Sequence, residues 1–539
     1  MTEPSSDAAE ANRRLEIIHR QISKLSKITE LIAEGTFFFY HPREEDVDDG
    51  SLSRLAENFN RMIARIQDHQ QNLEEKVSQR TAELEASLTA IERLKQEQDG
   101  DYFLTSELLA PFGSNRSDNQ FLDIELYTRQ KKRFTYKHWN RSIGGDISGS
   151  SDIELAGRPF TFFFNADAMG KSIPGAGGAL VLGAVAESIV QRTHISSSYS
   201  GKAPEIWLKE AFLEIVKVYE GFEGSTMITM IIGLVDHASG AMYWINADHP
   251  LPVLYRNGRA TYLQTEFLYN KVGLKLYGGI MSRHSRPRPL TISTLRLRPG
   301  DVILCGSDGK DDLVLGEDED GQRIINSDAG LFQRIVEKGD GRIDRILTGL
   351  EAQGQLMDDL SLLRLRFNGP GIRVMPMHRE EEEIYGRYRS AATEEERETL
   401  RQDTHARLSD NAALILYKIA GQLEWRKGDP AAAAECLERY TRENPADSGA
   451  MHLFLNCCIK LGRRQEAVAL GERLILRDPA NIRLQLQVVS LYLRLDREKE
   501  GRRLLKNIDP HRITAEPIRK KFEELCQRLD LHLNTGATT

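Results

Sequence analysis

The apolar positions of the first hundred residues recur at intervals of three and four, which is typical of a coiled coil. Residues 15–32 predict a first helix, and residues 52–73 predict the start of a second. Residues 35–50 hold glycines, a proline and many acidic side chains, and this length suits a connector along two parallel helices. After Leu73 the apolar seam shifts by four residues, which locally unwinds a supercoil. We expect residues 1–100 to form a parallel coiled coil that makes the chain a homodimer.

The central part of the chain changes to short apolar runs separated by turns. Two longer apolar stretches, residues 178–194 and 206–219, predict helices. The predicted strands cover residues 158–164, 226–235, 241–246, 252–255, 301–305 and 361–367. This mixture predicts an α+β domain over residues 121–368, preceded by a helical linker or switch over residues 101–120.

The C-terminal part repeats itself after a charged linker, residues 369–409, which contains two runs of glutamate. Residues of one kind recur 34 positions apart: Gly428, Ala433 and Pro445 return as Gly462, Ala467 and Pro479. This is the period of tetratricopeptide repeats, in which small residues let paired helices approach closely. We expect residues 410–539 to form an all-α helical repeat; the alternative is an irregular helical bundle.

Composition narrows the classes of function. The length of 539 residues predicts three or four domains, and 40% hydrophobic with 28% charged residues is ordinary globular composition. A net charge of −8 does not indicate the basic surface that binding of nucleic acid requires. No apolar run that we identify reaches the ~18 residues of a membrane span, and we expect no secretory signal. Five cysteines without a Cys-x-x-Cys pair indicate a reducing compartment, so we expect a cytoplasmic protein.

Four aspartates of the central domain share one setting, because each lies at the end of an apolar strand or in a glycine-containing turn beside one. They are Asp146, Asp167, Asp308 and Asp358, the last with its neighbour Asp359. Carboxylates gathered at the edge of a sheet repel one another unless cations lie between them, and such oxygen ligands select Mg²⁺ or Mn²⁺. Two such ions would hold a water as hydroxide and clamp a phosphoryl oxygen. A single Asp-Gly is more often a turn, so the interpretation depends on the whole set.

Five motifs stand in order around these aspartates. They are Gly144-Gly145-Asp146, Asp167-Ala168-Met169-Gly170, the segment Asn246-Ala247-Asp248-His249-Pro250, Ser307-Asp308-Gly309 and Asp358-Asp359-Leu360-Ser361. In this order they resemble the metal-dependent serine/threonine phosphatases of the type 2C superfamily, in the bacterial SpoIIE-like branch. The resemblance implies a β-sandwich flanked by helices and two Mn²⁺ or Mg²⁺ ions.

The same resemblance implies the roles of individual residues. Asp146 and Asp167 would contact the metal pair together with the backbone carbonyl of Ala168, and Asp308 and Asp358 would complete the catalytic set. Asp359 is the second choice for the last position. His249 is expected to shape a turn and is not counted as catalytic.

One motif departs from the family. Most relatives carry Gly-His-Gly where this chain has Gly170-Lys171-Ser172. Lys171 would either attract a phosphoryl group or stand solvated on the surface. The same stretch imitates the end of a nucleotide-binding P-loop, but that motif needs a glycine where Asn165 stands.

The N-terminal helices also resemble a known module. Leu55, Ala56, Phe59, Asn60 and Met62 match the second-helix motif of HAMP signalling modules. Residues 76–84 look like the helical linkers that join sensors to outputs. The resemblance implies that residues 1–100 carry a signal; the alternative is a dimerising coiled coil without a signalling role.

Taken together, the motifs predict a cytoplasmic Mn²⁺- or Mg²⁺-dependent protein serine/threonine phosphatase. By resemblance its substrate would be a phosphorylated regulatory protein, an anti-sigma-factor antagonist of the STAS type, in bacterial partner switching. The helical repeats would hold a peptide or protein ligand. The alternative is a catalytically silent scaffold whose coiled coil and repeats mediate protein–protein interaction.

Overall fold

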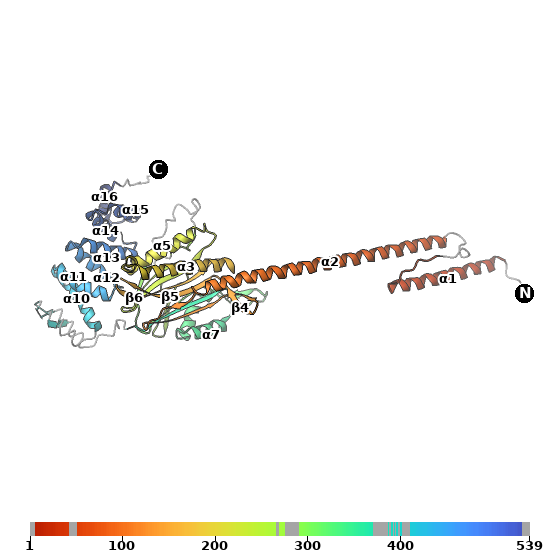
Figure 1. Ribbon diagram of the computed structural model, residues 1–539, viewed down its shortest axis with the longest axis horizontal. Helices are drawn as coiled ribbons and strands as arrows, with labels where there is room; N and C mark the ends of the chain where they lie inside the picture. Colours follow the sequence, from red (N-terminus) through yellow and green to blue (C-terminus); the bar gives the residue numbers. More distant parts are fainter. Residues whose placement is uncertain are drawn as a thin grey trace. The chain divides into compact units, whose positions relative to one another are not determined.

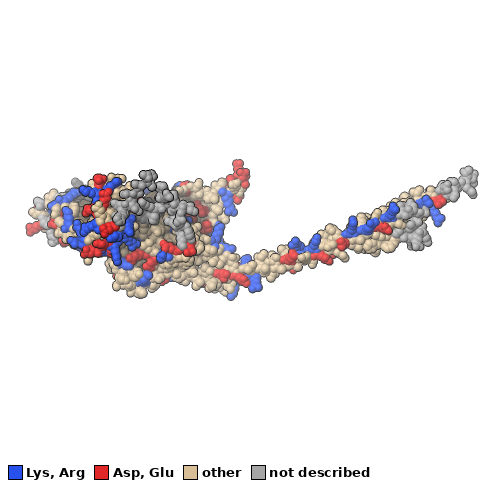
Figure 2. Space-filling view, turned by 90° about the horizontal axis from the view of Figure 1, so that it is seen from above, with Lys and Arg blue, Asp and Glu red and all other residues tan. Residues whose placement is uncertain are grey.

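The computed structural model describes residues 6–41, 51–265, 269–274, 290–369 and 410–530, with a few residues between 386 and 400. The chain divides into two compact units, Met1–Gln98 and Asp99–Thr539 (Figure 1). Most of the charged linker and residues 42–50 of the expected connector lie outside the described residues. Figure 2 shows acidic and basic side chains interspersed on one face of the molecule.

The N-terminal unit contains helix α1 (Ser6–Ala33) and the first part of helix α2 (Ser51–Leu109). The segment after α1 is tied to α2, because the Tyr40 backbone N–H donates to Asn60 Oδ1 at 2.7 Å and Asn60 Nδ2 donates to the Tyr40 carbonyl at 2.7 Å. Ile63 of α2 is buried. The apolar residues of the expected seam, by contrast, are exposed in the single chain: Leu15, Ile22, Leu73, Val77, Leu84 and Ile91. A second copy covering this seam remains a prediction.

The central domain contains two antiparallel sheets that pack face to face. The first has the strand order β1-β5-β6-β7-β8-β11, in which only β1 pairs in parallel, and the second has the order β10-β9-β12-β16-β2. Phe163 and Trp244 of the first sheet share a buried core with Ile303, Leu363 and Phe367 of the second. This core between the sheets makes the domain a β-sandwich.

The strands have the following bounds. The first sheet contains β1 (Asn115–Arg116), β5 (Asp146–Leu155), β6 (Arg158–Ala168), β7 (Ile228–Asp236), β8 (Ala241–Ala247) and β11 (Ser293–Arg296). The second contains β2 (Leu122–Arg129), β9 (Val253–Arg256), β10 (Arg259–Tyr262), β12 (Val302–Gly306) and β16 (Leu360–Phe367). Outside the sandwich, β3 (Lys132–Tyr136) pairs with β4 (Trp139–Ile143), and β13 (Leu313–Glu317) pairs with β14 (Arg323–Ile325) and β15 (Gln355–Leu356).

Helices cover both outer faces of the sandwich (Figure 1). Helices α3 (Ile173–Ile195) and α5 (Pro204–Glu220) pack on the first sheet, with the short α4 (Ser197–Ser200) between them in sequence. Helices α6 (Leu331–Lys338) and α7 (Ile343–Gln353) pack on the second. Among the described residues only α3 is long and apolar enough to cross a membrane by length and composition. Its buried side chains lie in the core shared with β5 and β6.

The C-terminal helices keep the spacing seen in the sequence. The helices are α10 (Asp410–Lys427), α11 (Pro430–Glu443), α12 (Ser448–Lys460), α13 (Arg464–Arg477), α14 (Ile482–Arg494), α15 (Glu498–Lys506) and α16 (Glu516–Arg528). The starts of α11 and α13, and those of α12 and α14, are 34 residues apart. Asp429, Asp447 and Asn481 cap α11, α12 and α14 by accepting backbone N–H groups. Two successive helix starts therefore recur with the 34-residue spacing, and a true tetratricopeptide repeat stays a prediction.

Two of the boundaries that differ from the sequence-based expectation have a local cause. The helix expected over residues 101–120 ends at Leu109, because Pro111 and Gly113 follow and the chain turns into β1. Helix α3 begins at Ile173, five residues before the expected start at 178, because Pro174 is favourable in the first turn. The six predicted strands and two predicted helices of the central domain are all present.

Candidate active site

The register of two strands brings Asp146 and Asp167 together. Asp146 begins β5, Asp167 lies near the end of β6, and the two residues are direct partners in the antiparallel pair. Gly145 makes room for this approach, because a Cβ atom built on it would lie 2.2 Å from the Ala168 carbonyl oxygen. Gly145 also accepts a backbone hydrogen bond from Ala168 at 3.1 Å. The first two metal motifs thus meet at one end of the first sheet.

The second sheet supplies the other carboxylates. Asp308 follows β12, and Asp358 and Asp359 precede β16, which pairs with β12. A Cβ atom built on Gly309 would lie 1.9 Å from the Asp359 carbonyl oxygen, so the two loops are in direct backbone contact. Carboxylates more than two hundred residues apart in sequence therefore meet at one edge of the sandwich.

Burial and mutual repulsion raise the pKa values of these carboxyl groups. Burial and the charge of Asp167 raise the pKa of Asp146 well above its usual range. Burial, together with the charges of Asp308, Asp359 and Asp358, raises the pKa of Asp167 to about 7. Burial also raises the pKa of Asp308 and of Asp359. Without cations, this edge of the sandwich disfavours full ionisation of its carboxylates.

The donor set fits hard divalent cations. All the converging groups are oxygen donors, and Asp146 Oδ1 is buried without a hydrogen-bond partner. Among the described residues, however, no three Asp, Glu, His or Cys side chains already stand in a ready-made metal site. The case that this site suits a divalent cation therefore depends on its excess negative charge and on the unpaired carboxylate oxygen of Asp146.

Asp358 and Asp359 have different surroundings. Asp359 accepts two backbone hydrogen bonds, from the N–H of Lys131 to Oδ1 at 2.7 Å and from the N–H of Gly145 to Oδ2 at 3.0 Å. The Asp358 carboxylate accepts one hydrogen bond from the described residues, that of the Asp359 N–H at 2.9 Å. Asp359 thus connects the segment after β2 to the Gly-Gly-Asp turn. The carboxylate of Asp358 accepts fewer hydrogen bonds from the described residues.

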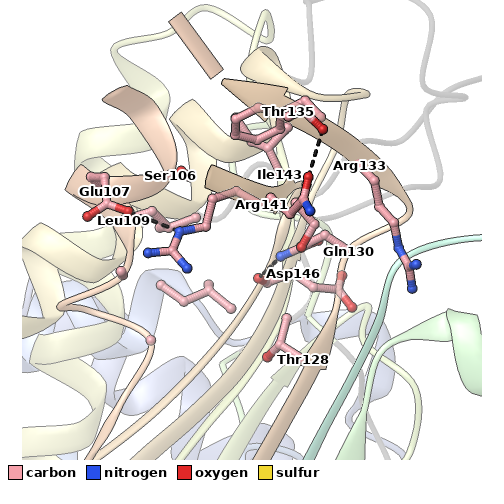
Figure 3. Close-up of a pocket in the computed structure, with 17 residues that line it drawn as sticks. Ser106, Glu107, Leu109, Thr128, Gln130, Arg133, Thr135, Arg141, Ile143 and Asp146 are labelled. Carbon is pink, nitrogen blue, oxygen red and sulfur yellow. Dashed lines mark hydrogen bonds and ion pairs between the residues drawn. The ribbon is translucent and has the colours of Figure 1, made fainter. Parts of the chain in front are cut away.

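Two residues that sequence reasoning did not assign also hold Asp146. Ser307 Oγ donates to Asp146 Oδ2 at 2.6 Å. Gln130 Nε2 donates to the Asp146 carbonyl at 2.8 Å, and Gln130 Oε1 is buried without a partner. Ser307 precedes Asp308 in the fourth motif, so its position offered a signal, but Gln130 lies in no motif. Figure 3 shows Gln130 beside Asp146 at the base of a cavity.

This cavity, of about 1010 Å³, is lined in part by Asp146. Its wall includes residues 106–110 at the end of α2, the β3–β4 hairpin, and the arginines Arg133 and Arg141. Arg141 forms an ion pair with Glu107 at 3.2 Å, and Figure 3 shows both side chains on one side of the cavity. Arg133 forms no ion pair with any residue that the structure describes.

Lys171 and His249 occupy contrasting positions. Lys171 is exposed just before α3. His249 is buried, and its N–H donates to Asn246 Oδ1 at 2.8 Å while Asn246 Nδ2 donates to the His249 carbonyl at 2.9 Å. These two bonds close a turn after β8. Burial, with the nearby charge of Lys310, lowers the pKa of His249 to about 3, so its ring is neutral near pH 7.

Comparison with known proteins finds a family for part of the chain. Residues 160–368 match the family Stage II sporulation protein E (SpoIIE). No curated protein matches the chain. The match covers less than half of the chain and identifies residues 160–368, within the central domain, as a SpoIIE-type domain. The matched region begins after Asp146, so the Gly-Gly-Asp motif lies outside it. The pairing of β5 with β6 places Asp146 of that motif beside Asp167.

Three solved structures are similar to parts of the chain at low identity. The RsbU and RsbW domains of a Mycobacterium tuberculosis protein are 18% identical, with 50% of this chain and 69% of that chain covered and a TM-score of 0.33. The phosphatase domain and a regulatory fragment of SpoIIE from Bacillus subtilis are 15% identical, with 47% and 64% covered and a TM-score of 0.33. The SiaA phosphatase domain of Pseudomonas aeruginosa is 14% identical, with 52% and 98% covered and a TM-score of 0.34.

Proposed function

We propose that this chain is a cytoplasmic, Mn²⁺- or Mg²⁺-dependent phosphatase that removes phosphate from serine or threonine of a regulatory protein. The observation that carries the proposal is the direct pairing of Asp146 with Asp167, at the edge where the loops carrying Asp308, Asp358 and Asp359 arrive. A purely structural edge would gain nothing from several clustered carboxylates that raise one another's pKa. Divalent cations would offset this repulsion.

Two ions would be held by the carboxylates of Asp146, Asp167, Asp308 and Asp358, with the backbone carbonyl of Ala168 as a further ligand. The freer carboxylate of Asp358 supports its choice over Asp359, whose oxygens accept two backbone N–H groups. When bound, such ions supply an activated water and stabilise the charge of a phosphoryl group. The chain's own contribution is to orient the carboxylates: Ser307 holds Asp146 Oδ2, and Gln130 holds its backbone.

We propose a phosphorylated anti-sigma-factor antagonist, of the STAS type, as the substrate. The support is the SpoIIE family match and the cavity beside Asp146, which is large enough for a phosphorylated side chain and its neighbours. Arg133 at this cavity has no ion-pair partner among the described residues and would attract the anionic substrate. The helical repeats would bind a further peptide or protein. Comparing phosphoproteins retained by the full chain and by a chain lacking residues 410–539 tests that role.

We further propose that the N-terminal helices regulate the site in a homodimer. The end of α2 packs against the β3–β4 hairpin. The ring centroids of Tyr102 and Phe134 are 5.6 Å apart, and those of Phe103 and Tyr136 are 5.2 Å apart. Tyr102 and Phe134 share a small buried cluster with Ala176, in the first turns of α3. Deleting residues 1–98 should change both the oligomeric state and the specific activity. Unchanged values for both would overturn this regulatory role.

The catalytic proposal is tested with p-nitrophenyl phosphate and the full chain. Turnover should require Mn²⁺ or Mg²⁺, stop on chelation, and collapse in Asp167→Asn and Asp308→Asn. The matched control is Asp344→Asn, an exposed aspartate of α7 that pairs with Arg342, and it should keep parental turnover. Turnover without metal, or full activity in both site variants, would overturn the proposal.

A further inference from the structure

A continuous line of buried polar side chains runs from the turn after β8 to the carboxylate of Asp146. His249 Nε2 and Asn165 Oδ1 are 2.7 Å apart, and Asn165 Nδ2 donates to Ser361 Oγ at 2.9 Å. Ser361 leads on to Asp146 through Ser307, whose hydroxyl donates to Asp146 Oδ2. His249, Asn165 and Ser361 are all buried. The line crosses the sandwich, because Asn165 belongs to the first sheet and Ser361 to the second.

The chemistry of the partners determines the direction of each hydrogen bond. The amide oxygen of Asn165 only accepts, so His249 Nε2 carries the proton that it donates. The neutral ring then accepts at Nδ1, where the hydroxyl of Thr229 lies 3.1 Å away. Each member therefore donates toward Asp146, in the order Thr229, His249, Asn165, Ser361 (through its backbone N–H) and Ser307. Hydrogen bonds of this kind hold a ligating carboxylate in one orientation.

Ser307 makes the last link to the carboxylate of Asp146. The backbone N–H of Ser361 donates to Ser307 Oγ at 3.0 Å, and Ser307 Oγ donates to Asp146 Oδ2 at 2.6 Å. The other amide proton of Asn165 goes to Ser148 Oγ at 2.6 Å, on the neighbouring strand. Asn165 thus uses its oxygen and both amide protons, and it holds β5, β6 and β16 in one arrangement beneath Asp146.

We propose that His249 and Asn165 are positioning residues that orient Asp146 as a metal ligand, acting through Ser361 and Ser307. The inference rests on the proposed function, because it concerns how the same site prepares one ligand for its cation. It goes beyond a turn-shaping role for His249, since the turn itself is closed by backbone groups of His249 and the side chain of Asn246. The imidazole ring is not needed to close that turn and is free to serve the line of hydrogen bonds.

Calorimetric titration of the full, metal-free chain with MnCl₂ tests the proposal. His249→Ala should raise the Kd for Mn²⁺ by about tenfold, the scale typical of residues that orient metal ligands. His249→Gln, which keeps an N–H donor, should recover part of the affinity. With p-nitrophenyl phosphate, His249→Ala should need more Mn²⁺ for half-maximal turnover and should regain much of its kcat at saturating Mn²⁺.

The matched control is His237→Ala. His237 is also buried and lies 2.8 Å from a hydroxyl of β6, that of Thr161, but Thr161 is at the opposite end of that strand from Asp167. This control should lose a buried histidine and keep the parental Kd for Mn²⁺. Thermal melting of each metal-free variant separates loss of folding from loss of binding.

The outcomes are distinct. A folded His249→Ala protein with the parental Kd would overturn the inference and leave the proposed function standing. If His249→Ala does not fold, Thr229→Val decides instead, because it removes only the hydroxyl at the start of the line and should still raise the Kd for Mn²⁺. A parental Kd in Thr229→Val would then overturn the inference. A parent chain that binds no Mn²⁺ at millimolar concentration would overturn the proposed function itself.

Discussion

Glu205 and Arg477 form a buried ion pair that joins the central domain to the helical repeats. Arg477 Nε donates to Glu205 Oε1 at 3.0 Å, and Arg473 Nε donates to Glu205 Oε2 at 2.9 Å. Glu205 is 0% exposed and Arg477 4% exposed. Nearby, the N–H of Ile292 donates to the Leu476 carbonyl at 2.8 Å. Helix α13 is therefore docked on the central domain through satisfied polar contacts.

Removing the carboxylate should destabilise the protein strongly. Glu205→Ala leaves two buried guanidinium groups without their anion, and breaking a buried pair in this way costs about 3–5 kcal/mol. Chemical denaturation followed by circular dichroism measures the change. The control is Asp328→Ala, which breaks an exposed pair with Arg334 and should leave the denaturation midpoint unchanged. Equal midpoints for Glu205→Ala and the parent would show that the docked interface contributes nothing to stability.

The same pair predicts a loss of stability in acid. Burial alone would raise the pKa of Glu205, but Arg473 and Arg477 outweigh it and lower the pKa to about 2. A lowered pKa means that the unfolded chain binds more protons, so the stabilisation is complete above the usual glutamate value of 4.5 and disappears as the pH falls toward 2. Melting temperatures of the parent between pH 6 and pH 3 should fall more steeply than those of Glu205→Gln. Parallel curves would contradict the assignment.

Gly145 should tolerate no side chain. A Cβ atom there would lie 2.2 Å from the Ala168 carbonyl oxygen, so Gly145→Ala must push apart the strands that carry Asp146 and Asp167. We expect loss of phosphatase turnover and of Mn²⁺ binding. Gly177→Ala in α3 is the control, because no atom lies within 4 Å of the position that the new methyl group would take, and alanine favours helix by about 1 kcal/mol. A fully active Gly145→Ala would contradict the close approach of the two strands.

The metal-free site should make stability fall as the pH rises. Burial and neighbouring carboxylates raise the pKa of Asp167 from 3.8 to about 7, so the folded chain binds the additional proton between these values. The stabilisation from this proton is present at low pH and is lost as the pH rises toward 7. Melting in EDTA should show this loss in the parent and less of it in Asp167→Asn. Mn²⁺ should reverse it and release protons, which calorimetry in buffers of different ionisation enthalpy measures.

The sequence indicated which aspartates to consider for the site. Asp146, Asp167, Asp308 and Asp358 stood out because each lies at the end of an apolar strand or in a glycine-containing turn beside one, and these contexts depend only on neighbouring residues. Strand β5 was missed because its residues, Asp146–Leu155, include serines, a glycine and aspartates instead of a continuous apolar run. Its position is determined by pairing with β6 and not by its own composition.

Local sequence patterns do not predict the roles of Gln130, Asn165 and His249. Each is a polar residue whose role depends on partners tens to hundreds of residues away, such as Ser361 for Asn165. Periodicity and spacing describe neighbours along the chain, whereas hydrogen bonds across two sheets depend on how those sheets pack.

The amino-acid sequence by itself indicated the order of the three regions, six strands and two helices of the central domain, the 34-residue spacing and the set of acidic residues, because each follows from local periodicity and turn chemistry. Only the tertiary structure decided that Asp146 faces Asp167, that Asp359 is bound by backbone N–H groups, and that Glu205 receives two arginines of the repeats. The physical reason is that register, sheet packing and burial set distances and pKa values, and none of these is a property of a short segment.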